Sequence, residues 1–167
     1  MNLEQEVWFQ RLAEPEQRDI RDIVQKIYGW ASGTITRGVS QDSPLKDYFF
    51  ALYAVGSVTS NKQNPTDTDL LLVTDKFPNI ILERPYFRDL ITILNEDGRV
   101  CNQDLDQKIK YFAIGPREKY DIQSNGPCKP IDLIYQWGFD SIESWEKVDP
   151  FKESKAKLIF NIVPKKI

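Results

Sequence analysis

The pattern between residues 49 and 74, FFALYAVGSVTSNKQNPTDTDLLLVT, constrains this chain more than any other part of it. Its first apolar run, Phe49 to Val55, is partly aromatic and β-branched and ends at a glycine, which predicts a buried strand. The second apolar run, Leu70 to Val73, predicts another buried strand. Between the two runs lie a Gly56-Ser57 corner, nine further residues and the triplet Asp67-Thr68-Asp69. These polar residues are therefore expected at the edge of a sheet.

Two aspartates open the second apolar run. Positions i and i+2 of a strand point to the same face, so Asp67 and Asp69 are expected to project together. Two carboxylates about 4 Å apart repel each other by roughly 1 to 4 kcal/mol, depending on the local dielectric. A shared proton, a basic partner or a divalent cation would offset this repulsion. Among cations, oxygen-only ligands favour Mg²⁺, Mn²⁺ or Ca²⁺. A Ca²⁺-binding EF-hand loop is excluded, because Leu71 and Leu72 stand where it needs Asp or Asn and then Gly.

The Gly56-Ser57 corner offers a complementary chemistry. Backbone N–H groups and a serine hydroxyl are the groups that a phosphate oxygen seeks. An anion cradle that faces a pair of carboxylates indicates a nucleotide bound together with Mg²⁺.

The order Gly56-Ser57, a nine-residue spacer and Asp67-x-Asp69 in an apolar strand resembles the signature of the DNA polymerase β-type nucleotidyltransferases. In size the chain is similar to the minimal nucleotidyltransferases of that superfamily, some of which act as antitoxins to HEPN toxins. The resemblance implies an α/β (α+β) fold, in which a small mixed β-sheet is flanked by helices.

The resemblance also implies roles for these residues. Asp67 and Asp69 would hold Mg²⁺, with two ions expected, at the phosphates of a nucleoside triphosphate. Gly56 and Ser57 would steady the β- or γ-phosphate. The implied reaction moves a nucleoside monophosphate from an NTP to a hydroxyl group of a protein or a small molecule and releases pyrophosphate. AMP, with ATP as its donor, is the first candidate.

A third acidic residue is expected on a later strand. The segment IDLIYQW, which begins at Ile131, predicts a strand that holds one acid, Asp132, among apolar neighbours. A buried aspartate needs a partner. The resemblance implies that Asp132 completes a three-carboxylate site, helps to bind the second Mg²⁺ and favours deprotonation of the acceptor hydroxyl. An ion pair with an Arg or Lys at the strand edge would also satisfy this carboxylate.

The sequence departs from the family pattern at three positions. Asn61 stands where many relatives have a glycine, but asparagine tolerates a left-handed conformation. Lys62 is the one basic residue between the Gly-Ser corner and the aspartates, and Thr68 replaces a usually apolar residue. These departures concern the subgroup rather than the superfamily.

Composition excludes several classes of chemistry. The chain has no histidine, which rules out His-based triads, His zinc sites and His general bases. Its net charge of −3 and pI near 5.1 do not favour a long nucleic acid as the main partner, which would need a basic stripe. Cys101 and Cys128 have no metal-like spacing and suggest reduced thiols. The sequence has no signal-peptide pattern and no apolar run of about 18 residues, so a cytoplasmic location without a membrane partner is expected.

Further elements are expected along the rest of the chain. The expected helices cover residues 3–12, 15–33, 86–94 and 141–148, and the expected strands cover 109–114 and 131–135. Asp140 is expected to cap the last of these helices, and residues 158–163 are expected to form a final strand or helix. A second Asp-x-Asp pair, Asp104 and Asp106, has no Gly-Ser before it and no apolar block after it, so 102–110 is interpreted as a solvated loop.

At 167 residues the chain is expected to form one nucleotidyltransferase-like domain over residues 1–167. It would comprise N-terminal helices (1–33), a signature core (48–137) and a C-terminal extension (138–167). Two other functions are compatible with the sequence: an antitoxin-like interaction protein whose partner is another chain, and a nucleotide-binding module without transfer activity. Template-directed polymerisation is not expected, because nothing resembles fingers, a thumb or a basic nucleic-acid track.

Overall fold

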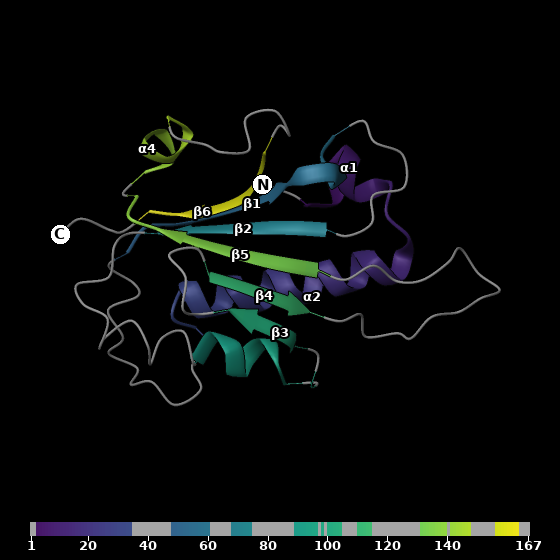
Figure 1. Cartoon of the computed structure of the whole chain (residues 1–167). Coiled ribbons are helices and arrows are strands. Elements are labelled where there is room, and N and C mark those ends of the chain that lie inside the picture. Colours follow the sequence, from purple (N-terminus) through teal and green to yellow (C-terminus); the bar gives the residue numbers. More distant parts are fainter. Residues whose placement is uncertain are drawn as a thin grey trace.

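A six-stranded mixed β-sheet forms the centre of the molecule, with strand order β3-β4-β5-β2-β1-β6 (Figure 1). The strands are β1 (Phe50–Val55), β2 (Thr68–Thr74), β3 (Val100–Asp104), β4 (Lys110–Ile114), β5 (Ile131–Trp137) and β6 (Lys157–Ile162). Strands β2 and β5 pair in parallel, and the other neighbouring strands pair antiparallel. The computed structural model describes residues 3–34, 48–60, 68–74, 89–96, 98, 100–104, 110–114, 131–139, 141–147 and 156–163.

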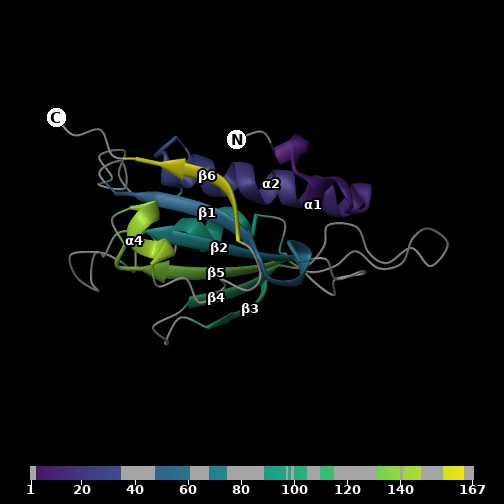
Figure 2. The same ribbon diagram turned by 90° about the horizontal axis from the view of Figure 1, so that it is seen from above.

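Helices cover both faces of this sheet. The long helix α2 (Glu14–Ala31) lies along one face, and the short helix α4 (Ile142–Glu146) lies on the other (Figure 2). The remaining helical elements are η1 (Leu3–Gln5), α1 (Val7–Gln10), η3 (Gly56–Val58) and residues 89–94. This architecture confirms the predicted mixed sheet flanked by helices. No helix in the described part of the chain is long and apolar enough to cross a membrane.

Side chains of the central strands alternate between the two faces, as strand geometry requires. Phe50, Leu52 and Ala54 of β1 pack on the α2 side, together with Leu70 and Leu72 of β2. The intervening residues of both strands pack on the α4 side, where Trp145 stacks on Tyr53 with ring centroids 4.3 Å apart. Strand β1 is therefore buried along its whole length. This explains why its sequence is a continuous apolar run rather than an alternating one.

Helix α2 contributes a regular apolar stripe to the core. Ile20, Ile23, Ile27 and Trp30 recur at helical spacing and are fully buried. Burial of each such side chain stabilises the fold by roughly 1.5 to 3 kcal/mol. The helix begins at Glu14, one residue before the predicted start at Pro15, and the proline occupies its first turn.

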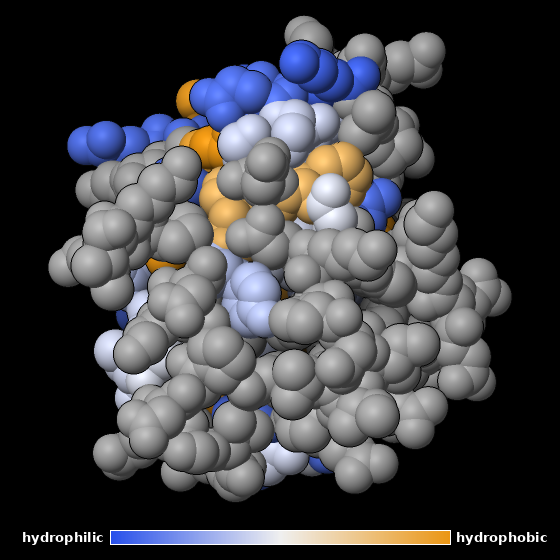
Figure 3. Space-filling view, turned by 90° about the vertical axis from the view of Figure 1, so that its left-hand side faces the viewer, coloured by the Kyte–Doolittle hydropathy of each residue, from blue (hydrophilic) through white to orange (hydrophobic). Residues whose placement is uncertain are grey.

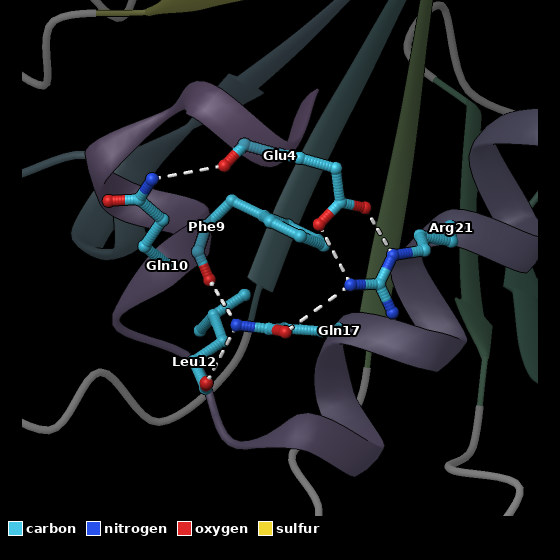
Figure 4. A network of polar contacts seen from close by, with 6 residues as sticks. All are labelled: Glu4, Phe9, Gln10, Leu12, Gln17 and Arg21. Carbon is cyan, nitrogen blue, oxygen red and sulfur yellow. Dashed lines mark hydrogen bonds and ion pairs between the residues drawn. The ribbon is translucent and has the colours of Figure 1, made fainter. Parts of the chain in front are cut away.

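A network of polar contacts joins the N-terminal elements to α2 (Figure 4). The side-chain amide of Gln17 donates to the carbonyl oxygens of Phe9 and Leu12, both at 3.1 Å. The guanidinium of Arg21 donates to the carboxylate of Glu4 through two nitrogens, one of which, Nη2, lies 2.9 Å from Oε2. This hydrogen-bonded pair lowers the pKa of the Glu4 carboxyl and raises that of Arg21. The predicted helix over 3–12 is thus two short pieces, η1 and α1, held against α2.

At the opposite end of the sheet, α4 separates charged from apolar residues. The helix buries Trp145 and exposes Glu143 and Glu146. A view of the molecule from this end shows hydrophilic residues along the upper rim and a smaller hydrophobic area beneath them (Figure 3). The indole N–H of Trp145 donates to Oε1 of Gln136 at 3.1 Å, which fixes α4 to the end of β5.

Two further sequence expectations need correction. Residues 102–104, expected in a solvated loop, belong to the edge strand β3, since pairing with β4 satisfies their backbone groups despite their polar side chains. The cap of α4 is Ser141 rather than Asp140, because the Oγ of Ser141 accepts from the backbone N–H of Ser144 at 3.1 Å. Along the chain, the antiparallel pair β3–β4 lies between β2 and its parallel neighbour β5.

Other expectations are confirmed in the described residues or fall outside them. Strands β1, β2, β4 and β5 and the helical residues 89–94 lie within or close to their predicted ranges, and residues 157–162 form a strand, one of the two forms expected there. The loops expected at 75–85 and 115–129, and nearly all of the loop expected at 34–45, lie outside the described residues.

Candidate functional site

Gly56, Asp69 and Asp132 lie at one end of the sheet, where β1 ends and β2 and β5 begin (Figure 1). Strand β1 runs antiparallel to β2, so its last residue, Val55, is the register partner of Asp69 near the start of β2. The turn that follows β1 is therefore brought next to the first acidic residue of β2 that the structure describes.

This turn begins at Gly56 in a conformation that favours glycine. Its φ angle is +78°, in the left-handed region. The chain then forms the short 3₁₀ helix η3, and the carbonyl oxygen of Gly56 accepts from the backbone N–H of Thr59 at 3.3 Å and from its hydroxyl at 3.1 Å. The corner predicted from Gly56-Ser57 is thus a closed turn directly after a buried strand.

The carboxylate of Asp69 lies against Gly56. A Cβ atom built on Gly56 would meet Oδ2 of Asp69 at 2.6 Å, closer than real Cβ contacts allow. Glycine is required here for two separate reasons: the backbone angle, and the space taken by this carboxylate. The sequence indicated Gly56 as a source of backbone N–H groups but gave no sign of this contact, because the two residues are 13 positions apart and meet only through strand pairing.

Asp69 and Asp132 occupy equivalent positions on neighbouring strands. Parallel pairing of β2 with β5 places them in direct register. Register partners in a sheet point to the same face and have backbones about 4.8 Å apart. The face is the α4 side, because Leu71 and Ile134, two residues further along each strand, pack there. Both aspartates are half-buried.

The chemistry of this pair suits a divalent cation. Like charges on register partners of neighbouring strands repel each other, and a hard cation with oxygen ligands bound between them would turn this interaction into an attractive one. Within the described residues, no group of three or more His, Cys, Asp or Glu side chains could hold a metal ion. The third carboxylate of the predicted cluster, Asp67, precedes β2 directly and lies outside those residues. Asp69 and Asp132 are therefore the two members of the predicted three-carboxylate cluster that the structure describes.

The predicted site residues differ in how far the structure describes them. Gly56, Asp69 and Asp132 come together from three different elements. Ser57 lies in η3, but its side chain is outside the described atoms, as are Asp67 and Lys62. The roles that the resemblance implies for all these residues stay predictions.

The sequence predicted a strand at 109–114 but did not indicate that it lies beside Asp132. Ala113 of β4 is the register partner of Asp132, and Asn102 of β3 is the register partner of Ala113. One row across the sheet thus runs from Val55 through Asp69 and Asp132 to these two residues. No local signal identifies such a row, since it depends on pairing between distant strands.

Comparison with known proteins gives a structural likeness and no sequence match. No protein-family model matches the sequence, and no curated protein does. Among solved structures, the fold is similar to the crystal structure of the Cid1 poly(U) polymerase with MgGTP bound, at 15% sequence identity and a TM-score of 0.40. The match covers 77% of this chain and 35% of the polymerase chain, so the chain spans about a third of the length of that protein.

Proposed function

We propose that this protein is a Mg²⁺-dependent nucleotidyltransferase. It would move a nucleoside monophosphate, with AMP as the first candidate, from an NTP to a hydroxyl group on a protein or small-molecule acceptor. The proposal includes assignment to the minimal nucleotidyltransferase branch. The observation that carries it is the convergence of Gly56, Asp69 and Asp132, because a Gly-turn beside two in-register carboxylates suits a triphosphate that enters with a cation.

In this proposal each described residue has a distinct task. The absence of a side chain at Gly56 lets the Asp69 carboxylate lie against the turn, so that one ligand could contact both this carboxylate and the backbone N–H groups of the turn. Asp69 and Asp132, with Asp67, would hold Mg²⁺, which when bound supplies positive charge to offset the charge of the triphosphate. Fixed donors of this kind lower the barrier by orientation and by charge compensation.

The proposed reaction is an in-line displacement at phosphorus. The acceptor oxygen would form a bond to the α-phosphorus, the bond between that phosphorus and its bridging oxygen would break, and pyrophosphate would leave with the electron pair. A carboxylate oxygen of Asp132 would take the proton of the acceptor hydroxyl, because the chain has no histidine to serve as a base. The proposed task of Asp132 therefore combines metal binding with positioning of that proton.

A thermal-shift panel tests the proposal. Wild-type protein and Asp69→Asn are heated with ATP, GTP, CTP or UTP, each with and without Mg²⁺. A ligand at about 100 times its Kd adds roughly 2.7 kcal/mol to the free energy of unfolding. For a chain of this size that gain raises Tm by about 5 to 10 °C. We expect a Mg²⁺-dependent rise with at least one nucleotide in wild type and none in Asp69→Asn.

The matched control is Glu146→Gln, which also removes one carboxylate charge, from an exposed position in α4. It should keep the full nucleotide-dependent rise. The nucleotide with the largest rise is then supplied with a label on its α-phosphate, and Mg²⁺-dependent transfer of label to an acceptor is measured. A rise in Tm without any transfer would favour the nucleotide-binding module. No rise with any nucleotide at millimolar concentration would refute the nucleotide site.

A further inference from the structure

Strand β6 is an edge strand of the sheet and has a mostly apolar sequence. Among the described strands, β6 pairs with β1 alone and ends the strand order. Its sequence, KLIFNI, is mostly apolar. An apolar edge strand offers a row of backbone donors and acceptors to any extended segment, so proteins normally protect such an edge. β6 therefore has the backbone chemistry of a site that accepts another strand.

A groove lies beside this edge, on the α2 side of the sheet. It encloses about 420 Å³ between η1, α2 and β6, and its apolar lining includes Leu3, Val24, Ile159 and Phe160. Tyr28 of α2 closes part of it, with its ring edge-on to Phe160 at a centroid distance of 5.2 Å. Tyr28 is nevertheless 49% exposed, an unusual position for a large ring that contacts the core. The groove is large enough for one bulky apolar side chain next to the strand edge.

The charge of the residues in and next to β6 indicates which charge a partner segment should carry. Lys157 is exposed at the start of the strand, and in the sequence Lys155 precedes it while Lys165 and Lys166 follow its end. Residues 155–167 contain these four lysines and no acidic residue, a net charge of +4. Since the whole chain carries −3, the remaining residues carry −7. The exposed Lys157, in a C-terminal sequence that carries only positive charge, favours an acidic partner segment.

We propose that the outer edge of β6 binds an extended, acidic segment of a partner protein by strand addition, with one large apolar side chain of that segment in the groove beside Tyr28. A second copy of this chain is a poorer occupant, because its own β6 would bring the same positive charge to the pair. The inference goes beyond nucleotidyl transfer and does not depend on it, since Asp69 and Asp132 lie on the α4 side of the sheet.

Fluorescence anisotropy with a labelled peptide, DEVSFSVED, tests this surface. Its alternating pattern presents Val, Phe and Val on one face of a strand, and its ends are acidic. The peptide KKVSFSVKK has the same core with reversed charge. We expect the acidic peptide to bind at least about tenfold more tightly, and this difference to shrink when the ionic strength rises from about 0.1 to about 1 M, which shortens the Debye length from about 10 to about 3 Å.

Two variants and one control locate the binding site. Tyr28→Glu places a negative charge in the groove and should weaken binding of the acidic peptide by at least about tenfold. Lys157→Glu should weaken it by about threefold or more. Val7→Glu, at a 60% exposed residue of α1 outside the groove lining, should leave binding within about twofold. Hydrogen exchange should slow in β6 when the acidic peptide is bound.

Three outcomes would overturn the proposal: equal binding of the two peptides, binding that Tyr28→Glu leaves unchanged in a variant with a native circular dichroism spectrum, or no protection of β6. A dimer in light scattering that Tyr28→Glu converts to a monomer would assign the edge to a second copy instead. The thermal-shift panel with nucleotides serves as an independent readout, so failure here leaves the nucleotide proposal standing and the reverse also holds.

Discussion

Replacement of Gly56 by alanine should disturb the fold and the candidate site together. Gly56 combines a φ angle of +78° with a Cβ position only 2.6 Å from Oδ2 of Asp69. Gly33 is a matched control, because its φ angle is +77° but nothing lies within 4 Å of its Cβ position. The Gly33→Ala variant therefore measures the backbone cost alone, and the Gly56→Ala variant measures that cost plus the collision with Asp69.

The expected magnitudes follow from these two contributions. A left-handed conformation costs a non-glycine residue roughly 1 to 2 kcal/mol. In Gly56→Ala, Asp69 must also move by at least 0.4 Å to restore a separation of 3.0 Å. Forcing a side chain about 30° away from its rotamer costs about 0.5 to 1.5 kcal/mol. Gly56→Ala should therefore lower the free energy of unfolding by about 2 to 3 kcal/mol and Gly33→Ala by about 1 to 2.

Urea unfolding of the two variants measures the stability difference, and the nucleotide panel measures the site. Gly33→Ala should keep the Mg²⁺-dependent rise in Tm, because its turn is remote from the aspartates in the sequence and has open space around it. Gly56→Ala should lose most of that rise, because the displaced Asp69 no longer holds its position.

A double-mutant cycle isolates the contact between the two residues. In Asp69→Ala the Oδ2 atom is gone, and the nearest remaining atom, Cβ of residue 69, lies 3.7 Å from the Cβ position on Gly56, an ordinary contact distance. Gly56→Ala should thus cost less in the Asp69→Ala background, by about 0.5 to 1.5 kcal/mol. The contact between Gly56 and Asp69 would be refuted by two results together. Gly56→Ala would lower the free energy of unfolding equally in wild type and in Asp69→Ala, and Gly56→Ala would keep its nucleotide response.

Two further predictions concern charge. Asp132→Asn should abolish the Mg²⁺-dependent nucleotide response and should leave the free energy of unfolding, measured with urea, within about 1 kcal/mol of wild type, because it keeps the shape of the side chain. A loss of stability above about 1 kcal/mol would show that Asp132 instead serves the fold. Glu4 has a pKa lowered by its hydrogen bond from Arg21, so the stability it contributes is present above the carboxyl's ordinary pKa and lost as pH falls through the lowered value. The difference in Tm between wild type and Glu4→Gln should therefore narrow at acid pH, and a gap that widens on acidification would contradict this linkage.

The parts of the fold that could be predicted from sequence are those with a local signal. Helix α2 has an apolar stripe from Ile20 to Trp30 and a proline in its first turn, and β1 is a continuous apolar run that ends at a glycine. Such patterns are set by periods of 3.6 and 2 residues and need no partner. Strand β3 lacked any such pattern, because its sequence VCNQD is mostly polar and only its pairing with β4 makes it a strand.

In the candidate site too, some features have a local sequence signal and others depend on strand pairing. Gly56, Asp69 and their separation could be read from the sequence, whereas the contact between them needs the antiparallel register of β1 and β2. The place of Asp132 could be expected from the resemblance, but its alignment with Asp69 depends on pairing between segments about 60 residues apart. The assignment of residues 1–167 to one domain stays a prediction.

The register in which β2 pairs with β5 bears on the candidate site. Both strands are apolar on both faces: Leu70 and Leu133 pack on the α2 side, and Leu71 and Ile134 pack on the α4 side. A shift of two residues would preserve this two-sided apolar pattern and would move the only acidic residue of each strand out of register. The observed register instead keeps the two carboxylates side by side, where they repel each other. The apolar pattern by itself does not distinguish the two registers, and under the proposed function a cation bound between Asp69 and Asp132 would stabilise the observed one.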